Sequence, residues 1–354
     1  MGEAVMGQGI SRRGFLRGVA AVTGGTLLGA ELGTGTAWAA GGPPILSCDE
    51  WGARPNSDVV NVVRRRPVRI LVHHTATPNV PDLGRPAAVA LARAIQNFHM
   101  DRRGWLDSGQ HFTISRGGYV LEGRRRSLEA LRSGRKQVEG AHCTGQNLVS
   151  IGIENEGTYL DADPPRVLWD RLRELCAYTC VQYGIAPTAI HGHRDFKDTA
   201  CPGDRLYGEL PRLRAEVGAA IGTPPAAGAE GTATWPLLRV GDRGAVVTAA
   251  QYLLRDAGMA GVRPDGRYTE DLADVVRAFQ LARGGDERAG DEVTGMIAGG
   301  SWPLLARPVR RGEGGDAERA VEVLATGRSA ESLPDVVAER EWQRLLAAAG
   351  PPMR

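Results

Sequence analysis

The sequence predicts an α/β fold, with a mixed central β-sheet flanked by helices, followed by a small all-α domain. Apolar strand patterns such as Val68–His74 and Val149–Glu154 alternate with helical patterns, an order that favours a sheet covered by helices. A Gly117-Gly118 pair between two strand patterns indicates a hairpin, so the sheet should contain antiparallel as well as parallel neighbours. Beyond residue 234 helical patterns dominate, which predicts the second domain.

Each predicted element has its own local signal. Val68–His74 is mostly apolar, as in a strand buried on both faces. Pro165–Tyr183 has apolar residues at helical spacing and stops at Gly184. The remaining elements expected in the first domain are, in order, a tether at 40–47, a loop at 48–55, a helix at Pro86–Arg102 with an apolar stripe of Val89, Leu91, Ile95 and Phe98, strands at His111–Ser115, Tyr119–Glu122 and Thr188–Ile190, and a helix at Leu210–Ile221.

The composition is that of a soluble globular protein. The 354 residues are enough for two domains, and 42% of them are hydrophobic and 24% charged. The formal charge of +2 gives no reason to expect a nucleic-acid partner. No later stretch is long and apolar enough to span a bilayer, so we expect no stable membrane insertion. We also expect the protein to be a monomer.

The N-terminal residues 1–39 have the pattern of a twin-arginine signal peptide. Ser11–Arg17 contains the paired arginines, and a Gly/Ala-rich apolar run follows them. Ala37-Trp38-Ala39 matches the small-x-small cleavage rule, so the mature chain should begin at Ala40. The alternative is a membrane anchor, but glycines and Glu31 interrupt the run. We therefore expect secretion, to the extracellular space or the cell wall.

The chain has five cysteines, all in the mature part. If Cys201 binds a metal, four remain, which allows two disulfides in an oxidising compartment. Cys176 and Cys180 lie four residues apart on a predicted helix, where a bridge between them is geometrically awkward. We expect them to pair outward with Cys48 and Cys143, in an order left open.

Residues 222–234 are rich in Gly, Pro, Ala and Thr and are typical of a linker after a first domain at 40–221. Residues 235–306 form the predicted helical domain. Its opening segment, Leu238–Gly244, is weakly similar to Val309–Gly315. The tail 307–354 is therefore either a degenerate second repeat or an ordinary helical tail.

The stretch His191–Gly203 concentrates imidazole, thiol and carboxylate groups. His193 and Cys201 lie eight positions apart, too far for one helical face but suited to a loop that folds back on itself. Imidazole nitrogen and thiolate sulfur are ligands that Zn²⁺ prefers. A third ligand could come from the end of the strand Val68–His74, where only one of the two final histidines can face a given site. The competing histidines are His99, His111, His142 and His191.

A catalytic zinc site also needs a base for its water. Glu154 and Glu156 end an apolar strand pattern, where a buried strand would meet a cleft. The alternative is that both are charges facing solvent at the end of a strand.

These motifs resemble the zinc-dependent N-acetylmuramoyl-L-alanine amidases, a superfamily that includes the peptidoglycan recognition proteins. The resemblance covers roughly residues 48–215. The matching segments are Val72–Ala76, Gly140–His142, Ile151–Glu154, Gly192–Arg194 and Thr199–Gly203.

The resemblance implies zinc on His73, His193 and Cys201, and an oxyanion donor at Thr199. In one branch of the family a tyrosine assists catalysis, but Gln110 stands at that position here. In another branch a glutamate in Gly-Ile-Glu does so, and Glu154 matches it. We also expect His74, His142 and Asn155 to bind substrate.

The implied activity is cleavage of the amide between N-acetylmuramic acid and L-alanine in peptidoglycan. The alternatives are a non-catalytic peptidoglycan sensor on the same fold, a zinc peptidase acting on the stem peptide, and a structural zinc knuckle with Asp195 or His191 as fourth ligand. Segments such as Gly241–Gly244 and Ala278–Gln280 resemble a three-helix peptidoglycan-binding domain, although the usual C-terminal pattern is reduced to Gly295 and Trp302.

Overall fold

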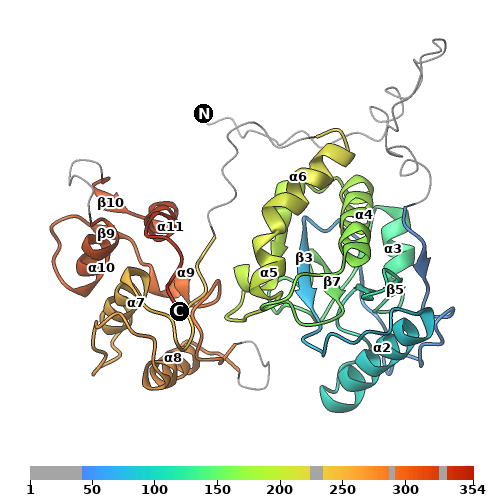
Figure 1. Ribbon diagram of the computed structural model, residues 1–354, viewed down its shortest axis with the longest axis horizontal. Helices are drawn as coiled ribbons and strands as arrows, with labels where there is room; N and C mark the ends of the chain where they lie inside the picture. Colours follow the sequence, from blue (N-terminus) through green and yellow to red (C-terminus); the bar gives the residue numbers. More distant parts are fainter. Residues whose placement is uncertain (1–41, 224–233, 287–291, 327–332) are drawn as a thin grey trace, which may run out of the picture. The chain divides into compact units, whose positions relative to one another are not determined.

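The computed structural model describes residues 42–223, 234–286, 292–326 and 333–354 (Figure 1). The predicted signal peptide at 1–39 and most of the predicted linker at 222–234 lie outside these ranges. The chain divides into two compact units. Among the described residues, the first unit comprises 42–191 and 202–223, and the second unit comprises 192–201 and those between 234 and 354.

The first unit contains a six-stranded mixed sheet with the order β1-β5-β4-β7-β3-β8. Both β3 and β4 run parallel to β7, whereas β4 and β5 form the predicted antiparallel hairpin. The predicted fold class is therefore confirmed. The strands are β1 (Ile45–Leu46), β3 (Arg69–His74), β4 (Phe112–Ile114), β5 (Val120–Glu122), β7 (Ser150–Asn155) and β8 (Ile190–Gly192), and β2 (Val62–Val63) pairs separately with β6 (Gln137–Val138).

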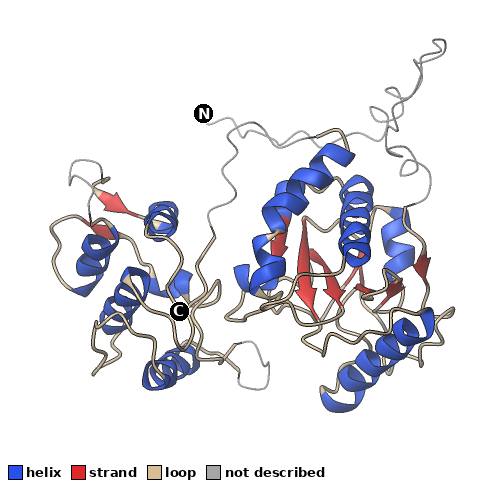
Figure 2. Ribbon diagram, in the orientation of Figure 1, coloured by secondary structure: helices blue, strands red, loops and turns tan. Residues whose placement is uncertain are grey.

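Helices flank this sheet, as Figure 2 shows. On one face, Ile70, Val72 and Ile153 are buried in a single core with residues of α4 and α6. Alternation along the strands turns His73 and Glu154 to the opposite face. The helices of this unit are α2 (Arg85–Asn97), α3 (Ser127–Ser133), α4 (Arg166–Tyr183), α5 (Asp204–Gly208) and α6 (Leu210–Ala220).

Three predicted elements need correction. The tether at 40–47 contains β1, which adds to the sheet by pairing in parallel with β5. The strand predicted at Thr188–Ile190 begins later, because a 3₁₀ turn occupies Pro187–Ala189 and the strand follows it. The helix predicted at Pro86–Arg102 ends in a π-helical turn (Phe98–Arg102).

The buried stripe of α2 also differs from the predicted one. Its most buried residues are Ala88, Ala92 and Gln96, whereas Phe98 is 50% exposed. Small side chains allow the helix to approach Trp51 closely, and the Gln96 side chain bonds the Arg54 backbone. The size of the side chains, and not their hydrophobicity alone, therefore determines which face of α2 is buried.

Neither of the two predicted disulfides forms. Cys176 and Cys180 are residues of α4 that are buried in the main core, whereas Cys48 belongs to a separate cluster with Trp51. The Cys48 thiol instead contacts the Gly123 carbonyl at 3.4 Å. Burial raises the pKa of all three thiols, which keeps them protonated and poorly reactive.

The second unit has one hydrophobic core that draws residues from both 235–306 and 307–354. The indole of Trp302 donates to the Pro236 carbonyl at 2.6 Å, and that of Trp342 donates to the Arg307 carbonyl at 2.8 Å. This parallel favours the degenerate second repeat, which we retain as a proposal. The elements are α7 (Ala245–Asp256), α8 (Glu270–Ala282), α9 (Trp302–Leu305), α10 (Asp316–Leu324) and α11 (Glu339–Ala348), with β9 (Val309–Arg310) pairing with β10 (Val336–Val337). Among the helices in the described ranges, none is both long and apolar enough to cross a membrane.

Candidate metal centre

The first half of the site lies at the ends of two parallel strands. His73 of β3 is in register with Glu154 of β7, so their side chains leave the sheet on the same face. The next residue, His74, points to the other face, where its Nδ1 accepts from the Tyr159 backbone N–H at 3.2 Å. Strand alternation thus selects His73 for the site.

The second half lies on a loop after β8. The loop folds back on itself, because the Arg194 backbone N–H donates to the Cys201 carbonyl at 3.1 Å. The Asp195 carboxylate accepts from the Gly192 backbone N–H at 2.9 Å and closes the turn that carries His193. The loop therefore directs His193 and Cys201 toward the same point.

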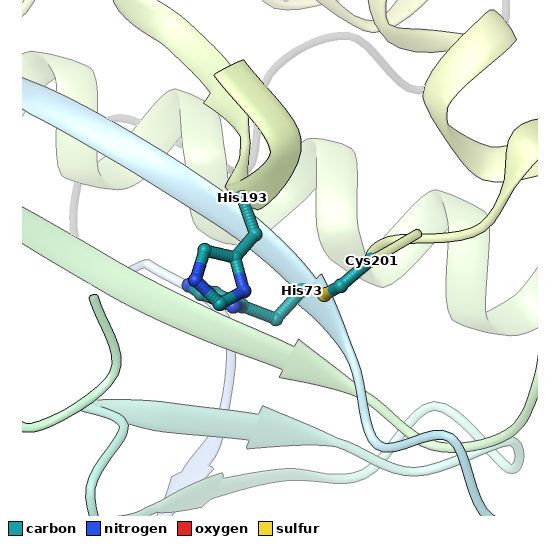
Figure 3. Close-up of side chains that lie close together, drawn as sticks. All are labelled: His73, His193 and Cys201. Carbon is teal, nitrogen blue, oxygen red and sulfur yellow. The ribbon is translucent and has the colours of Figure 1, made fainter. Parts of the chain in front are cut away.

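Figure 3 shows the side chains of His73, His193 and Cys201 converging. Their ligand atoms all lie within 4.8 Å of one another. Two imidazoles and a thiol are donors that suit Zn²⁺, and three protein ligands are typical of a catalytic rather than a structural zinc site. Among the described residues, no other His, Cys, Asp or Glu joins this group.

The His142 ring hydrogen-bonds the ring of His73. Its Nδ1 lies 3.1 Å from Nε2 of His73, and its Nε2 lies 3.4 Å from the Ser150 hydroxyl oxygen. The Ser150 hydroxyl donates its proton to the Gln146 carbonyl at 2.8 Å, so it can only accept from His142.

The Ser150 hydrogen bond sets the tautomer of His142, and His142 in turn sets the tautomer of His73. His142 carries its proton on Nε2, and its Nδ1 accepts from the Nε2–H of His73. Such an outer partner orients a ligating histidine and increases its basicity.

Two glycines make room for the His142 ring. A Cβ atom at Gly152 would lie 2.5 Å from the ring, and one at Gly140 would lie 2.6 Å from it. A glycine inside a buried strand pattern signals such a close approach. The glycine in Ile151-Gly152-Ile153 therefore indicates a close approach at this strand, although the sequence does not say which residue makes it.

Glu154 has an unusual environment for a carboxylate. Its Oε2 is buried and has no hydrogen-bond partner among the described residues. This burial raises the pKa of Glu154 to about 8, because desolvation disfavours the charged form. A nearby divalent cation would act in the opposite direction and favour the carboxylate.

Thr199 lies in the loop between the two loop-borne ligands. Its hydroxyl oxygen accepts from the Cys201 backbone N–H at 3.2 Å, which leaves its proton available for donation. Because the same hydrogen bond ties it to Cys201, this donor lies beside the metal ligands.

The other candidate residues have structural partners. Asn155 is fully buried and donates to the His73 carbonyl at 2.8 Å, so it supports the end of β3. The Glu156 carboxylate accepts from the Arg116 backbone N–H at 2.7 Å. Gln110, at the position of the absent tyrosine, is buried and donates to the Thr113 hydroxyl at 2.8 Å. Of the two glutamates, Glu154 is thus the one available as a base.

The mixed sheet with its flanking helices defines the class of protein, and the chain belongs to the family of N-acetylmuramoyl-L-alanine amidases and peptidoglycan recognition proteins. The family model described as N-acetylmuramoyl-L-alanine amidase matches residues 63–204. The resemblance expected from the motifs is confirmed at this level.

The chain is similar to two curated relatives and to a solved structure. Peptidoglycan-recognition protein LB of Drosophila melanogaster is 33% identical over 51% of this chain and 72% of its own length. The human N-acetylmuramoyl-L-alanine amidase is 32% identical over 47% of this chain, but the match spans only 28% of that protein. A solved structure of peptidoglycan recognition protein-LE in complex with tracheal cytotoxin is 28% identical, with a TM-score of 0.42, over 48% of this chain and 92% of that one.

Proposed function

We propose that this protein is a zinc-dependent hydrolase that cleaves the amide between N-acetylmuramic acid and L-alanine in peptidoglycan. The observation that carries the proposal is the convergence of His73, His193 and Cys201 from distant parts of the chain. Nitrogen and sulfur donors in a set of three fit a zinc ion with one position left for water or substrate.

When bound there, zinc polarises the scissile carbonyl and makes water a better nucleophile near neutral pH. The residues around it supply the remaining steps. The Glu154 carboxylate takes a proton from the attacking water and delivers it to the nitrogen of the leaving L-alanine. A single carboxylate can serve both transfers, because the proton that it accepts as a base is the proton that it then donates as an acid.

Thr199 stabilises the charge that develops on the substrate carbonyl oxygen. Its hydroxyl proton is the available donor beside Cys201, and a donor aimed at a developing oxyanion lowers the barrier. The His142 ring orients the imidazole of His73 through the hydrogen bond between them. Asn155 supports the same strand end through the His73 carbonyl.

The structure bears on two alternatives. A structural zinc knuckle would need a fourth protein ligand. The carboxylate of Asp195, one candidate for that ligand, instead accepts a hydrogen bond from the Gly192 backbone N–H. A purely sensing protein would have no need for a base, whereas Glu154 is in register with His73 and its Oε2 has no hydrogen-bond partner among the described residues. A zinc peptidase acting on the stem would use the same donors, and the products distinguish it.

We further propose that the protein is secreted through the twin-arginine pathway as a monomer and that residues 235–306 bind the cell wall. Export in the folded state would allow the metal to be loaded in the cytoplasm. These proposals depend on the signal-like residues 1–39 and on the resemblance of the Gly241–Gly244 segment to wall-binding domains.

The decisive experiment is mass spectrometry of purified muropeptides digested by the full-length protein, with and without a chelator. We expect an intact stem peptide with an L-alanine amino terminus, formed only without the chelator. The Cys201→Ala variant should lose bound zinc and activity together. Cleavage inside the stem would identify a peptidase, and muropeptide binding without any product would identify a sensor.

A further inference from the structure

The loop that carries two of the three proposed ligands belongs to the second unit. Residues 192–201 cluster with residues 228–354 and not with the sheet residues that flank them in sequence. This segment includes His193, Thr199 and Cys201. The residues that hold the loop therefore include some that lie about a hundred positions later in the chain.

Asp198 is the centre of these contacts. Its side chain is almost fully buried, and Oδ1 accepts from the backbone N–H groups of Ala298 at 2.7 Å and Ser301 at 2.9 Å. Its Oδ2 accepts from the Ser301 hydroxyl at 2.7 Å and from the Gln280 amide at 3.1 Å. Four donors on one buried carboxylate form a specific anchor, because hydrogen bonds to a charged group are the strong ones.

The backbone contacts beside Asp198 are equally close. The Gly299 N–H donates to the Arg194 carbonyl at 2.9 Å. A Cβ atom at Gly299 would overlap the Asp195 carbonyl, and one at Gly300 would lie 2.6 Å from Oδ2 of Asp198. Only glycine permits this approach of one backbone to another. The segment 298–301 is thus shaped to receive the loop.

We propose that Asp198 is a positioning residue for the metal centre, and that the segment 298–301 holds the 192–201 loop in its metal-binding conformation. The C-terminal part of the chain is then a component of the zinc site, in addition to any binding of the wall. The inference rests on the proposed function only for the identity of the ligands. It follows from preorganisation, because a loop that is already ordered loses less conformational entropy when it binds the ion.

The test measures zinc affinity of the full-length, initially metal-free protein by competition with a chromophoric chelator. Ser301→Ala removes one donor to Asp198, and Gly299→Ala forces the loop away, while neither touches a ligand. We expect both to weaken zinc binding by about 10- to 100-fold, as for other groups that support metal ligands. Faster hydrogen exchange in the peptide covering 192–201 should accompany this loss.

Two control variants separate positioning from general destabilisation. Thr269→Ala removes the N-cap of α8, whose hydroxyl accepts from the Leu272 N–H at 3.2 Å, and lowers the stability of the same unit away from the loop. Gly208→Ala adds a methyl group where nothing lies within 4 Å. Both should bind zinc like the wild type.

Wild-type zinc affinity in folded Ser301→Ala and Gly299→Ala would overturn the inference. Equal losses in Ser301→Ala and Thr269→Ala would also overturn it, since general destabilisation would then explain the effect. If Gly299→Ala does not fold, Ser301→Ala decides alone. Zinc retained by Cys201→Ala would instead count against the proposed ligand set, so the two failures are distinguishable.

Discussion

The two sides of the metal centre are held by different kinds of structure. His73 and Glu154 lie at the ends of adjacent parallel strands, where backbone register places them side by side. His193 and Cys201 lie on a loop whose shape depends on hydrogen bonds from single side chains. The sheet side is therefore supported by many similar interactions, whereas the loop side depends on a few specific ones.

This difference suggests where mutations will separate function from folding. On the sheet side, side chains can change while the strands keep their register, so chemistry should be lost with the metal retained. Changes to the loop side, or to the group behind His73, should alter metal binding itself. The three predictions below examine this contrast.

The largest effect is expected at Glu154. Glu154→Gln keeps the shape of the side chain but removes the base, so kcat should fall by about 10²- to 10⁴-fold while zinc content stays unchanged. Steady-state kinetics and metal analysis measure the two quantities. Glu156→Gln is the matched control, because its carboxylate bonds only the Arg116 backbone among the hydrogen bonds described here, and it should keep near-wild-type turnover.

Thr199→Val should have the next largest effect. The substitution retains the branched shape but removes the hydroxyl proton, so kcat should fall by about 10²- to 10³-fold. It also removes the acceptor of the Cys201 backbone N–H, so zinc affinity should fall as well. Thr199→Ser should recover most of the rate. A valine variant as active as wild type would mean that another group stabilises the oxyanion.

His142→Phe should have the smallest of the three effects and should act through the metal. The ring is retained, but His73 loses its acceptor, so zinc affinity should fall by about 10- to 100-fold. Chelator competition measures this loss. Ser150→Ala removes the next group in the chain and should weaken binding less than His142→Phe does. An unchanged affinity in His142→Phe would exclude the tautomer assignment.

Much of the fold could be predicted because its signals are local. Nearby residues alone predict the strand at Val68–His74, the helix at Pro165–Tyr183 and the hairpin turn at Gly117-Gly118. β1 was not predicted, because two residues carry too little pattern and the strand exists only through its pairing with β5. The disulfides were predicted wrongly, because cysteine counts do not show which hydrophobic cluster each thiol joins.

By itself, the sequence determined the fold class, the family and the residues to consider for the metal. Histidine and cysteine side chains and the spacing between them can be recognised in the sequence without the structure. The tertiary structure alone decided which groups support them. It placed His142 behind His73 through space that Gly152 leaves open, and it joined Asp198 to Ser301. A buried carboxylate must be matched by donors, and no local pattern shows which distant part of the chain supplies them.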